Sequence, residues 1–127
     1  MDKKRTFSGS PWEPVVGYCR AIRVGNIVEV AGTTAMKDGA IIGIGDAYQQ
    51  TIQALQTIEQ ALAEVGAAME HVVRTRMFVT DISKWEEIGK AHGEYFKDIK
   101  PVATMVEVKA LIEPELLVEI EVQAIIP

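Results

Sequence analysis

Three glutamates near the end of the chain have the residue type and the spacing for acid–base chemistry. Glu107, Glu119 and Glu121 alternate with valine and isoleucine in two strand-like runs, so we expect them on one face of a β-sheet whose opposite face is apolar. Such carboxylates either lie on a solvated outer face or belong to a partly buried interface or pocket. The alternation by itself favours the solvated face.

Two arginines offer partners of opposite charge. Arg74 and Arg76 alternate with apolar residues in the β-branched run at residues 71–80, which predicts a strand in the middle of the sheet. Opposite charges on neighbouring strands of one face stabilise a sheet by about 0.2–1 kcal/mol for each pair. With these arginines beside the glutamates, a partly buried interface or pocket becomes the preferred interpretation of the charged face, in place of a solvated one. The other face of this strand is predicted to carry Val73, Thr75, Met77 and Val79, with Val72 and Phe78 on the side of the arginines.

The elements that must position these residues follow an alternation of strands and helices. Gly25 and Asn26 predict a tight hairpin turn between the first two strands. Asp46 and Ser83 each begin a capping-box pattern, which indicates two helix N-termini. The predicted strands are residues 18–24, 27–32, 71–80, 103–109 and 117–124, with a smaller hairpin at 34–37 and 40–44 and helices at 46–66 and 83–96.

This order of elements predicts an α+β fold, in which a single mixed β-sheet carries two helices on one face. The uncovered face would hold charged and apolar residues together, so we expect self-association through this face into a closed cyclic oligomer. A ligand site is then expected where subunits meet. Residues 1–9 are polar and charged and are predicted to be a flexible N-terminal arm, followed by one domain at residues 10–127.

The composition narrows the classes of partner and cofactor. The 127 residues are 48% hydrophobic and carry a net charge of -5, which argues against general binding of nucleic acids or anionic membranes. Cys19 is the single cysteine, and His71 and His92 form no cluster at zinc-ligand spacing. We expect Cys19 and His92 to be structural. Without a bilayer-spanning run or a secretory signal, the sequence predicts a cytoplasmic protein with no metal and no cofactor.

Nearly the whole chain resembles one protein family. The pattern comprises Gly17, Tyr18 and Ala21 before RVGNIVEVAG, Gln50 in the first helix, HVVRTRMFVTD, the pair Tyr95 and Phe96, and Pro101 followed by VEV and VEIE. In order and spacing these residues resemble the Rid family, also called the YjgF or L-PSP endoribonuclease family. The resemblance implies a chorismate-mutase-like fold and a homotrimer with clefts between subunits. In well-studied members these clefts bind small carboxylates and hydrolyse enamines or imines, such as 2-aminoacrylate, to a keto acid and ammonia.

The resemblance also implies the residues of the site. Tyr18 matches the family's cleft tyrosine, and Glu119 matches the glutamate usually assigned to water activation. The family's carboxylate-binding arginine follows Pro101 by two residues, where this chain has Ala103, which supplies neither charge nor hydrogen bond. Catalysis is therefore predicted for Glu119, and ligand binding for Tyr18, Arg20, Ala31, Gly32, Arg76, Gly89, Ala103 and Met105.

Another cation could replace the missing arginine. Arg20 lies two residues after Tyr18, hence on the same side of its strand, and Arg76 stands where the family usually has a small or hydroxyl residue. One hypothesis places one of these arginines in the cleft as an anion anchor. The alternative is that Arg76 only pairs with the glutamates of the same face. Further departures from the family's common serine, glutamine and asparagine are Ala31, Thr33 and Gly89.

Three functions remain open from the sequence. The first is hydrolytic deamination of an enamine or imine, with a substrate choice altered by Ala103. The second is a noncatalytic trimer that binds or senses a small metabolite in the same clefts. The third is endoribonuclease activity, which an acidic chain without a paired-histidine centre supports poorly.

Overall fold

The computed structural model describes residues 2–127, and Met1 lies outside the described residues. Six strands form one sheet in the order β1-β2-β3-β8-β6-β7, and two short strands, β4 and β5, form a separate hairpin. The strands are β1 (Lys3–Thr6), β2 (Ala21–Val24), β3 (Ile27–Thr33), β4 (Met36–Lys37), β5 (Ala40–Ile41), β6 (Val72–Val79), β7 (Val102–Glu107) and β8 (Val118–Ile125). The helices are α1 (Ala47–Glu64) and α2 (Trp85–Phe96), with short turns η1 (Glu13–Gly17), η2 (Met69–His71) and η3 (Ile82–Lys84).

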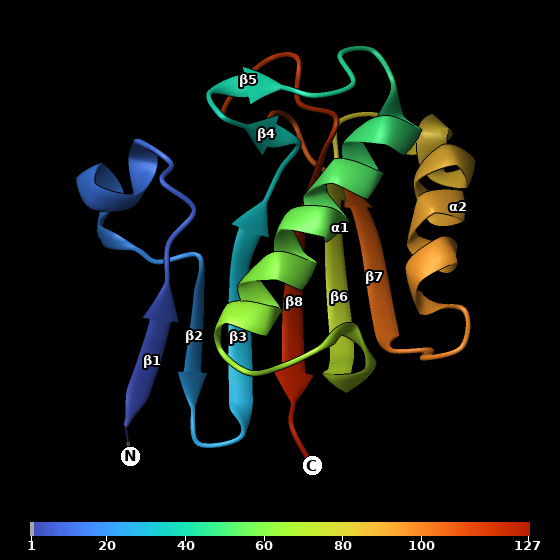
Figure 1. Ribbon diagram of the computed structural model, residues 1–127. Helices are drawn as coiled ribbons and strands as arrows, with labels where there is room; N and C mark the ends of the chain where they lie inside the picture. Colours follow the sequence, from blue (N-terminus) through green and yellow to red (C-terminus); the bar gives the residue numbers. More distant parts are fainter. Residues whose placement is uncertain (1) are drawn as a thin grey trace.

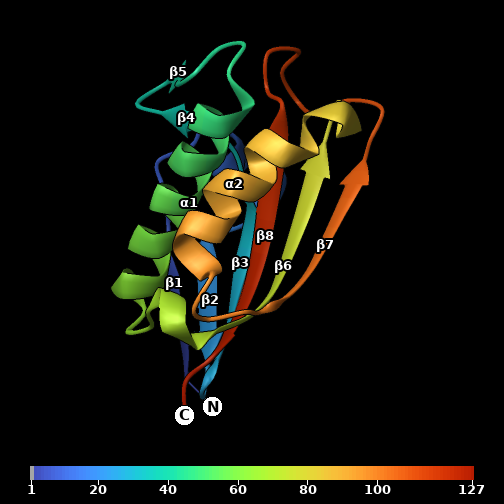
Figure 2. The same cartoon turned by 90° about the vertical axis from the view of Figure 1, so that its right-hand side faces the viewer.

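Both long helices lie on the same face of the large sheet (Figures 1 and 2). Helix α1 packs on β3 and β8, and α2 lies alongside α1. Strands β6 and β7 are parallel, whereas the other neighbouring strands are antiparallel. The predicted α+β fold, one mixed sheet with two helices on one face, is confirmed. None of the helices within residues 2–127 is long and apolar enough to cross a membrane.

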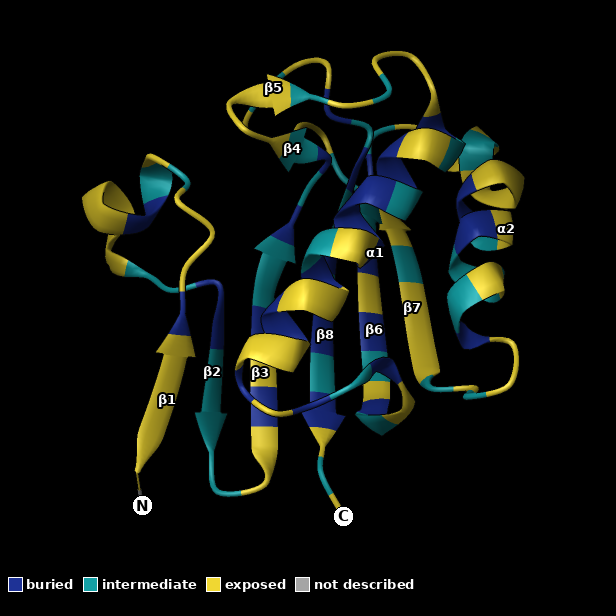
Figure 3. Ribbon diagram, in the orientation of Figure 1, coloured by how far each residue is buried: buried dark blue, intermediate teal, exposed yellow. Residues whose placement is uncertain are grey.

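The core lies between the helices and the sheet. Leu55, Ile58 and Leu62 of α1 have no solvent exposure, and neither do Val28 of β3 and Ile120 of β8. Full burial of each such side chain contributes about 1.5–3 kcal/mol relative to an exposed position. Along β8 the even-numbered residues are buried and the odd-numbered ones are partly exposed, so this strand divides the core from the uncovered face (Figure 3).

The sequence predicted the start of α1 correctly. The side chain of Asp46 accepts a hydrogen bond of 3.0 Å from the backbone N–H of Gln49, which satisfies one of the unpaired donors of the first turn. Gly66 follows the helix with a φ of +85°, a conformation that glycine adopts without steric cost. The second helix differs, because Asp81 accepts from the Ser83 N–H and caps η3, and α2 begins only at Trp85.

The N-terminal segment is more ordered than its composition indicates. Residues 3–6 form strand β1, which pairs antiparallel with β2, and the hydroxyl of Thr6 donates to Glu64 of α1. The prediction of a flexible arm at residues 1–9 is therefore wrong for this strand. An edge strand needs backbone pairing on one side only, and charged residues are usual there, so polarity alone did not distinguish it from a loop.

A bulge in β6 changes which valine enters the core. The pairing of β6 with β8 shifts register between Val72 and Arg74. Val72 is consequently buried, whereas Val73 is 37% exposed. The prediction that Val73 shares the apolar face with Thr75 is wrong, because one extra residue in a strand breaks the strict alternation of sides.

Glu107 does not lie with the other two glutamates. In the parallel pairing of β6 with β7, Val79 stands opposite Glu107, and paired residues of neighbouring strands point to the same side. Glu107 is thus on the helix-bearing side, where its carboxylate accepts a 3.0 Å hydrogen bond from the N–H of Ile82. Alternation holds within a strand and cannot be carried across the loop between β7 and β8, which is why this prediction failed.

Candidate functional site

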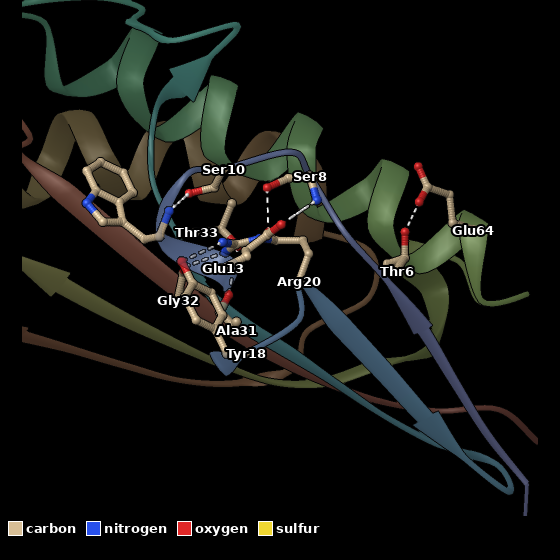
Figure 4. A network of polar contacts seen from close by, with 11 residues as sticks. Thr6, Ser8, Ser10, Glu13, Tyr18, Arg20, Ala31, Gly32, Thr33 and Glu64 are labelled. Atoms are coloured by element: carbon tan, nitrogen blue, oxygen red, sulfur yellow. Dashed lines mark hydrogen bonds and ion pairs between the residues drawn. The ribbon is translucent and has the colours of Figure 1, made fainter. Parts of the chain in front are cut away.

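A buried guanidinium organises one end of the uncovered face. Arg20 is 6% exposed, and its Nη1 donates to the carbonyl oxygen of Gly32 at 2.6 Å and to the hydroxyl of Thr33 at 3.1 Å. Its Nη2 donates to the hydroxyl of Tyr18 at 3.4 Å, and its Nε lies 3.4 Å from a carboxylate oxygen of Glu13 (Figure 4). Every nitrogen of the guanidinium therefore has a protein partner.

Glu13 is the anionic partner of this arginine. It begins the turn η1 and is 3% exposed. Its carboxylate also accepts hydrogen bonds from the hydroxyl of Ser8 at 2.7 Å and from the Ser8 N–H. Burial raises the pKa of Glu13, but the Ser8 hydrogen bonds and the Arg20 charge outweigh it, so the pKa is lowered from the ordinary 4.5. This ion pair ties residues 8–13 to β3 and was not predicted.

Glu119 lies beside the same part of β3. Gly32 leaves the space that its carboxyl occupies, because a Cβ built on Gly32 would lie 2.9 Å from the Glu119 Cδ. Burial and the negative charge of Glu121 raise the pKa of Glu119 above the ordinary 4.5, and the charge of Arg20 lowers it in part. A carboxyl with a raised pKa can serve as a general acid and, once ionised, as a general base near neutral pH.

Gly32→Ala tests this close packing. The added methyl group overlaps the flexible end of the Glu119 side chain and not the backbone, so we expect the carboxyl to move and the fold to persist. A displacement of about 1 Å of a reacting group can cost on the order of 10²-fold in rate. The measurements are kcat for enamine hydrolysis, the activity proposed below, and a urea unfolding curve. Unchanged kcat would contradict the catalytic placement of Glu119.

A hollow of about 1010 Å³ opens between the N-terminal segment and the uncovered face. Arg76 and Glu121 lie at its wall as an ion pair of 3.7 Å, and both side chains are more than two-fifths exposed. Arg76 thus has the glutamate partner that the second of the two sequence hypotheses expects. The wall also includes apolar and aromatic groups, among them Phe7, Tyr18, Ile22, Ala31 and Val122.

The other predicted ligand-binding residues lie elsewhere in the fold. Ala103 and Met105 are on β7, beside Thr75 and Met77 of β6 respectively, and therefore on the helix-bearing side. Gly89 is within α2, and His92 of the same helix lies 2.9 Å from the Thr75 hydroxyl. Burial lowers the pKa of His92, which favours a neutral imidazole hydrogen-bonded between helix and sheet.

One chain consequently holds two separate groups of predicted site residues. The first group lies on or beside β2, β3, β8 and β6 and comprises Tyr18, Arg20, Ala31, Gly32, Arg76 and Glu119. The second group, Gly89, Ala103 and Met105, belongs to α2 and the edge strand β7. Sequence reasoning missed Glu13 and Ser8 of the first group. The available signal was a single acidic residue within the apolar and proline-rich run PWEPVVG, seven positions before Arg20.

Comparisons with known proteins agree on one family. The family model described as Endoribonuclease L-PSP matches residues 9–126. The uncharacterized protein SCO2049 of Streptomyces coelicolor is 42% identical over 121 residues, covering 95% of this chain and 90% of that protein. The 3-aminoacrylate deaminase RutC of Acinetobacter baylyi is 31% identical and covers 88% of each chain.

Comparison with solved structures indicates the same family. Rv2704 from Mycobacterium tuberculosis, a member of the YjgF/YER057c/UK114 family, superposes with a TM-score of 0.90 at 50% identity, covering 98% of this chain and 100% of that one. A conserved Rid family protein from Yersinia pestis superposes with a TM-score of 0.86 at 28% identity, over 98% and 100% of the two chains. The chain therefore belongs to the YjgF or Rid family, whose family model is named Endoribonuclease L-PSP.

Proposed function

We propose that this protein hydrolyses small enamines or imines to a carbonyl compound and ammonia, in clefts between the subunits of a cytoplasmic homotrimer. The observation that carries the proposal is the Glu119 carboxyl, which is partly buried against Gly32 and has a raised pKa. The similarity to a 3-aminoacrylate deaminase supports the same reaction class.

Glu119 has a role in each proton transfer of this reaction. Its protonated carboxyl gives a proton to the enamine carbon, and the nitrogen lone pair forms the C=N bond of an iminium ion. The resulting carboxylate then takes a proton from a water molecule as the water oxygen bonds to the iminium carbon. The protonated carboxyl then gives its proton to the amine nitrogen, and the C–N bond breaks as ammonia leaves. The oxygen lone pair forms the C=O bond, and the Glu119 carboxylate takes the hydroxyl proton, which returns it to the protonated form.

The homotrimer is part of the proposal because of where the two groups of site residues lie. Tyr18 precedes β2, near one end of the strand order, whereas Ala103 is on β7 at the other end. A closed rotational arrangement can place the first group of one subunit against the second group of its neighbour. Sedimentation of the purified protein should give the mass of three chains, and a monomer at micromolar concentration would contradict this part of the proposal.

The assay compares substrates that differ in charge. We expect the protein to accelerate ammonia release from 2-aminoacrylamide, the uncharged analogue of 2-aminoacrylate, more than from 2-aminoacrylate itself. The physical reason is Ala103, which offers a carboxylate no charged partner. The control is Glu119→Gln at equal concentration. Equal rates for the wild type and this variant with every substrate would remove the deaminase proposal.

Ala103→Arg is expected to raise kcat/KM for 2-aminoacrylate on the order of 10- to 100-fold, because a hydrogen bond to a charged group contributes about 1.5–3 kcal/mol. The rate of pyruvate release at several concentrations of 2-aminoacrylate measures this kcat/KM. Ala103→Met is the matched control, since it adds a side chain of similar length without charge. A similar gain in both variants would show that side-chain volume matters there and that an anion anchor does not.

A noncatalytic binding or sensing trimer is the second candidate. The hollow of about 1010 Å³ beside Tyr18 favours it, because this volume is at the upper end of what small-molecule sites require. In that case a ligand would co-purify with the protein, and a ligand released from the cleft would be chemically unchanged. Mass spectrometry of the denatured protein, together with inactivity in the ammonia assay, would support this candidate over the first.

A further inference from the structure

Arg20 joins two parts of the molecule that are distant in sequence. Through Glu13 it contacts the N-terminal segment, and through the carbonyl of Gly32 it contacts β3. The contact with Gly32 falls where the pairing of β3 with β8 shifts register, between Val30 and Thr33. A backbone stretch outside the regular ladder lacks some of its sheet hydrogen bonds, so the Arg20 donor supplies a partner there.

The same glycine provides the space for the Glu119 carboxyl. The position of Gly32 therefore limits where the Glu119 carboxyl can lie, and Arg20 holds the Gly32 carbonyl by a hydrogen bond. Four of the five N–H groups of the Arg20 guanidinium are bonded to protein groups, only one N–H of Nη2 is left over, and 6% of the residue surface is exposed. This geometry disfavours the hypothesis that Arg20 replaces the family's anion anchor.

We propose that Arg20 is a positioning residue for Glu119, which fixes the backbone against which the Glu119 carboxyl packs and supplies a buried positive charge beside it. The inference deepens the proposed function and rests on it for its catalytic meaning. The elements around Glu119 contribute uncharged Gly32 and Phe78, and the charged or titratable Arg20, Tyr18, Glu121 and Arg76.

Two opposing charges make the inference testable without any enzyme assay. The charge of Arg20 lowers the pKa of Glu119, and the charge of Glu121 raises it. Protein labelled with ¹³C at the glutamate side-chain carboxyl carbon reports the titration of Glu119 by NMR, with the signal assigned from Glu119→Gln. We expect Glu119 to titrate at higher pH in Arg20→Gln and at lower pH in Glu121→Gln. A titration of Glu119 that is the same in Arg20→Gln and in the wild type would overturn the inference.

Two further variants separate charge, geometry and folding. Glu13→Gln/Arg20→Gln avoids leaving a buried carboxylate without its cation and should show the same upward shift as Arg20→Gln. Arg20→Lys keeps the charge but not the planar set of donors, so Glu119 should titrate as in the wild type while kcat falls by up to about 10²-fold. Wild-type kcat in Arg20→Lys would overturn the positioning role. Absence of activity in all proteins, with the NMR shifts as expected, would contradict the proposed function alone.

Discussion

Glu119→Gln is expected to lower kcat for enamine hydrolysis by on the order of 10²- to 10⁴-fold, the usual contribution of a positioned general acid or base. Glutamine keeps the shape of the side chain but neither gives nor accepts the proton. The variant should still fold, because Glu119 is replaced by a neutral group at a partly buried position. Ammonia release under saturating substrate measures the effect.

The same substitution is expected to stabilise the folded chain at neutral pH. The pKa of Glu119 is raised above 4.5 in the folded protein, so between 4.5 and the raised value the folded state binds more protons than the unfolded state. Stability of the wild type therefore falls as pH rises through this window. The Glu119→Gln variant has no titrating group at this position and therefore no such loss of stability. The difference in free energy of unfolding between the variant and the wild type should grow above pH 4.5 and then level off.

Glu107→Gln is the matched control for charge removal. Glu107 accepts a backbone hydrogen bond at η3, away from Glu119, and the amide oxygen of glutamine can accept the same bond. We expect wild-type kcat and no pH-dependent gain in stability. Urea unfolding at several pH values and equal protomer concentration compares all three proteins. Wild-type kcat in Glu119→Gln would contradict the catalytic expectation. A stability of this variant relative to the wild type that is lower at pH 7 than at pH 4 would contradict the stability expectation.

The second large effect concerns the buried ion pair. Arg20→Met should reduce the free energy of unfolding by about 3–5 kcal/mol, because Glu13 is left buried without its cation. The double variant Glu13→Gln/Arg20→Met removes the uncompensated charge and should recover part of this loss. Urea unfolding monitored by tryptophan fluorescence measures each free energy. A double variant no more stable than Arg20→Met would show that the loss comes from packing and not from the charge.

The sequence predicts best where the physical signal is local. Asp46 and Gln49 are three residues apart, and the hydrogen bond between them needs only the first turn of α1. The alternation of β8 needs only the strand itself, and it correctly separates Ile120 from Glu119 and Glu121. The fold follows from the order of such elements, because few topologies accommodate two strand–helix–strand units in one sheet.

The site is harder to predict because its contacts connect distant segments. The pairing of Glu13 with Arg20 depends on the conformation of residues 8–17. The spacing of residues in the sequence does not predict that conformation. The bulge at Val73 and the side on which Glu107 lies depend on register between strands. Whether Arg76 meets Glu121 was one of two open alternatives, and only the β6–β8 register, which places them opposite each other, distinguishes the two.

The strand order also constrains how this chain can fold. β8 is last in sequence but lies between β3 and β6, and it supplies the hydrogen-bonded link between β1-β2-β3 on one side and β6-β7 on the other. Pairings such as Ile27 with Ile125 join residues nearly a chain length apart. Contacts of this range slow folding, because the entropy of closing the long loop is lost before the contacts add any stability. Without β8 these two groups of strands share no strand pairing. The strand that carries Glu119 is therefore the one that joins the two parts of the sheet, so the placement of the Glu119 carboxyl beside Gly32 depends on the long-range pairing of β3 with β8.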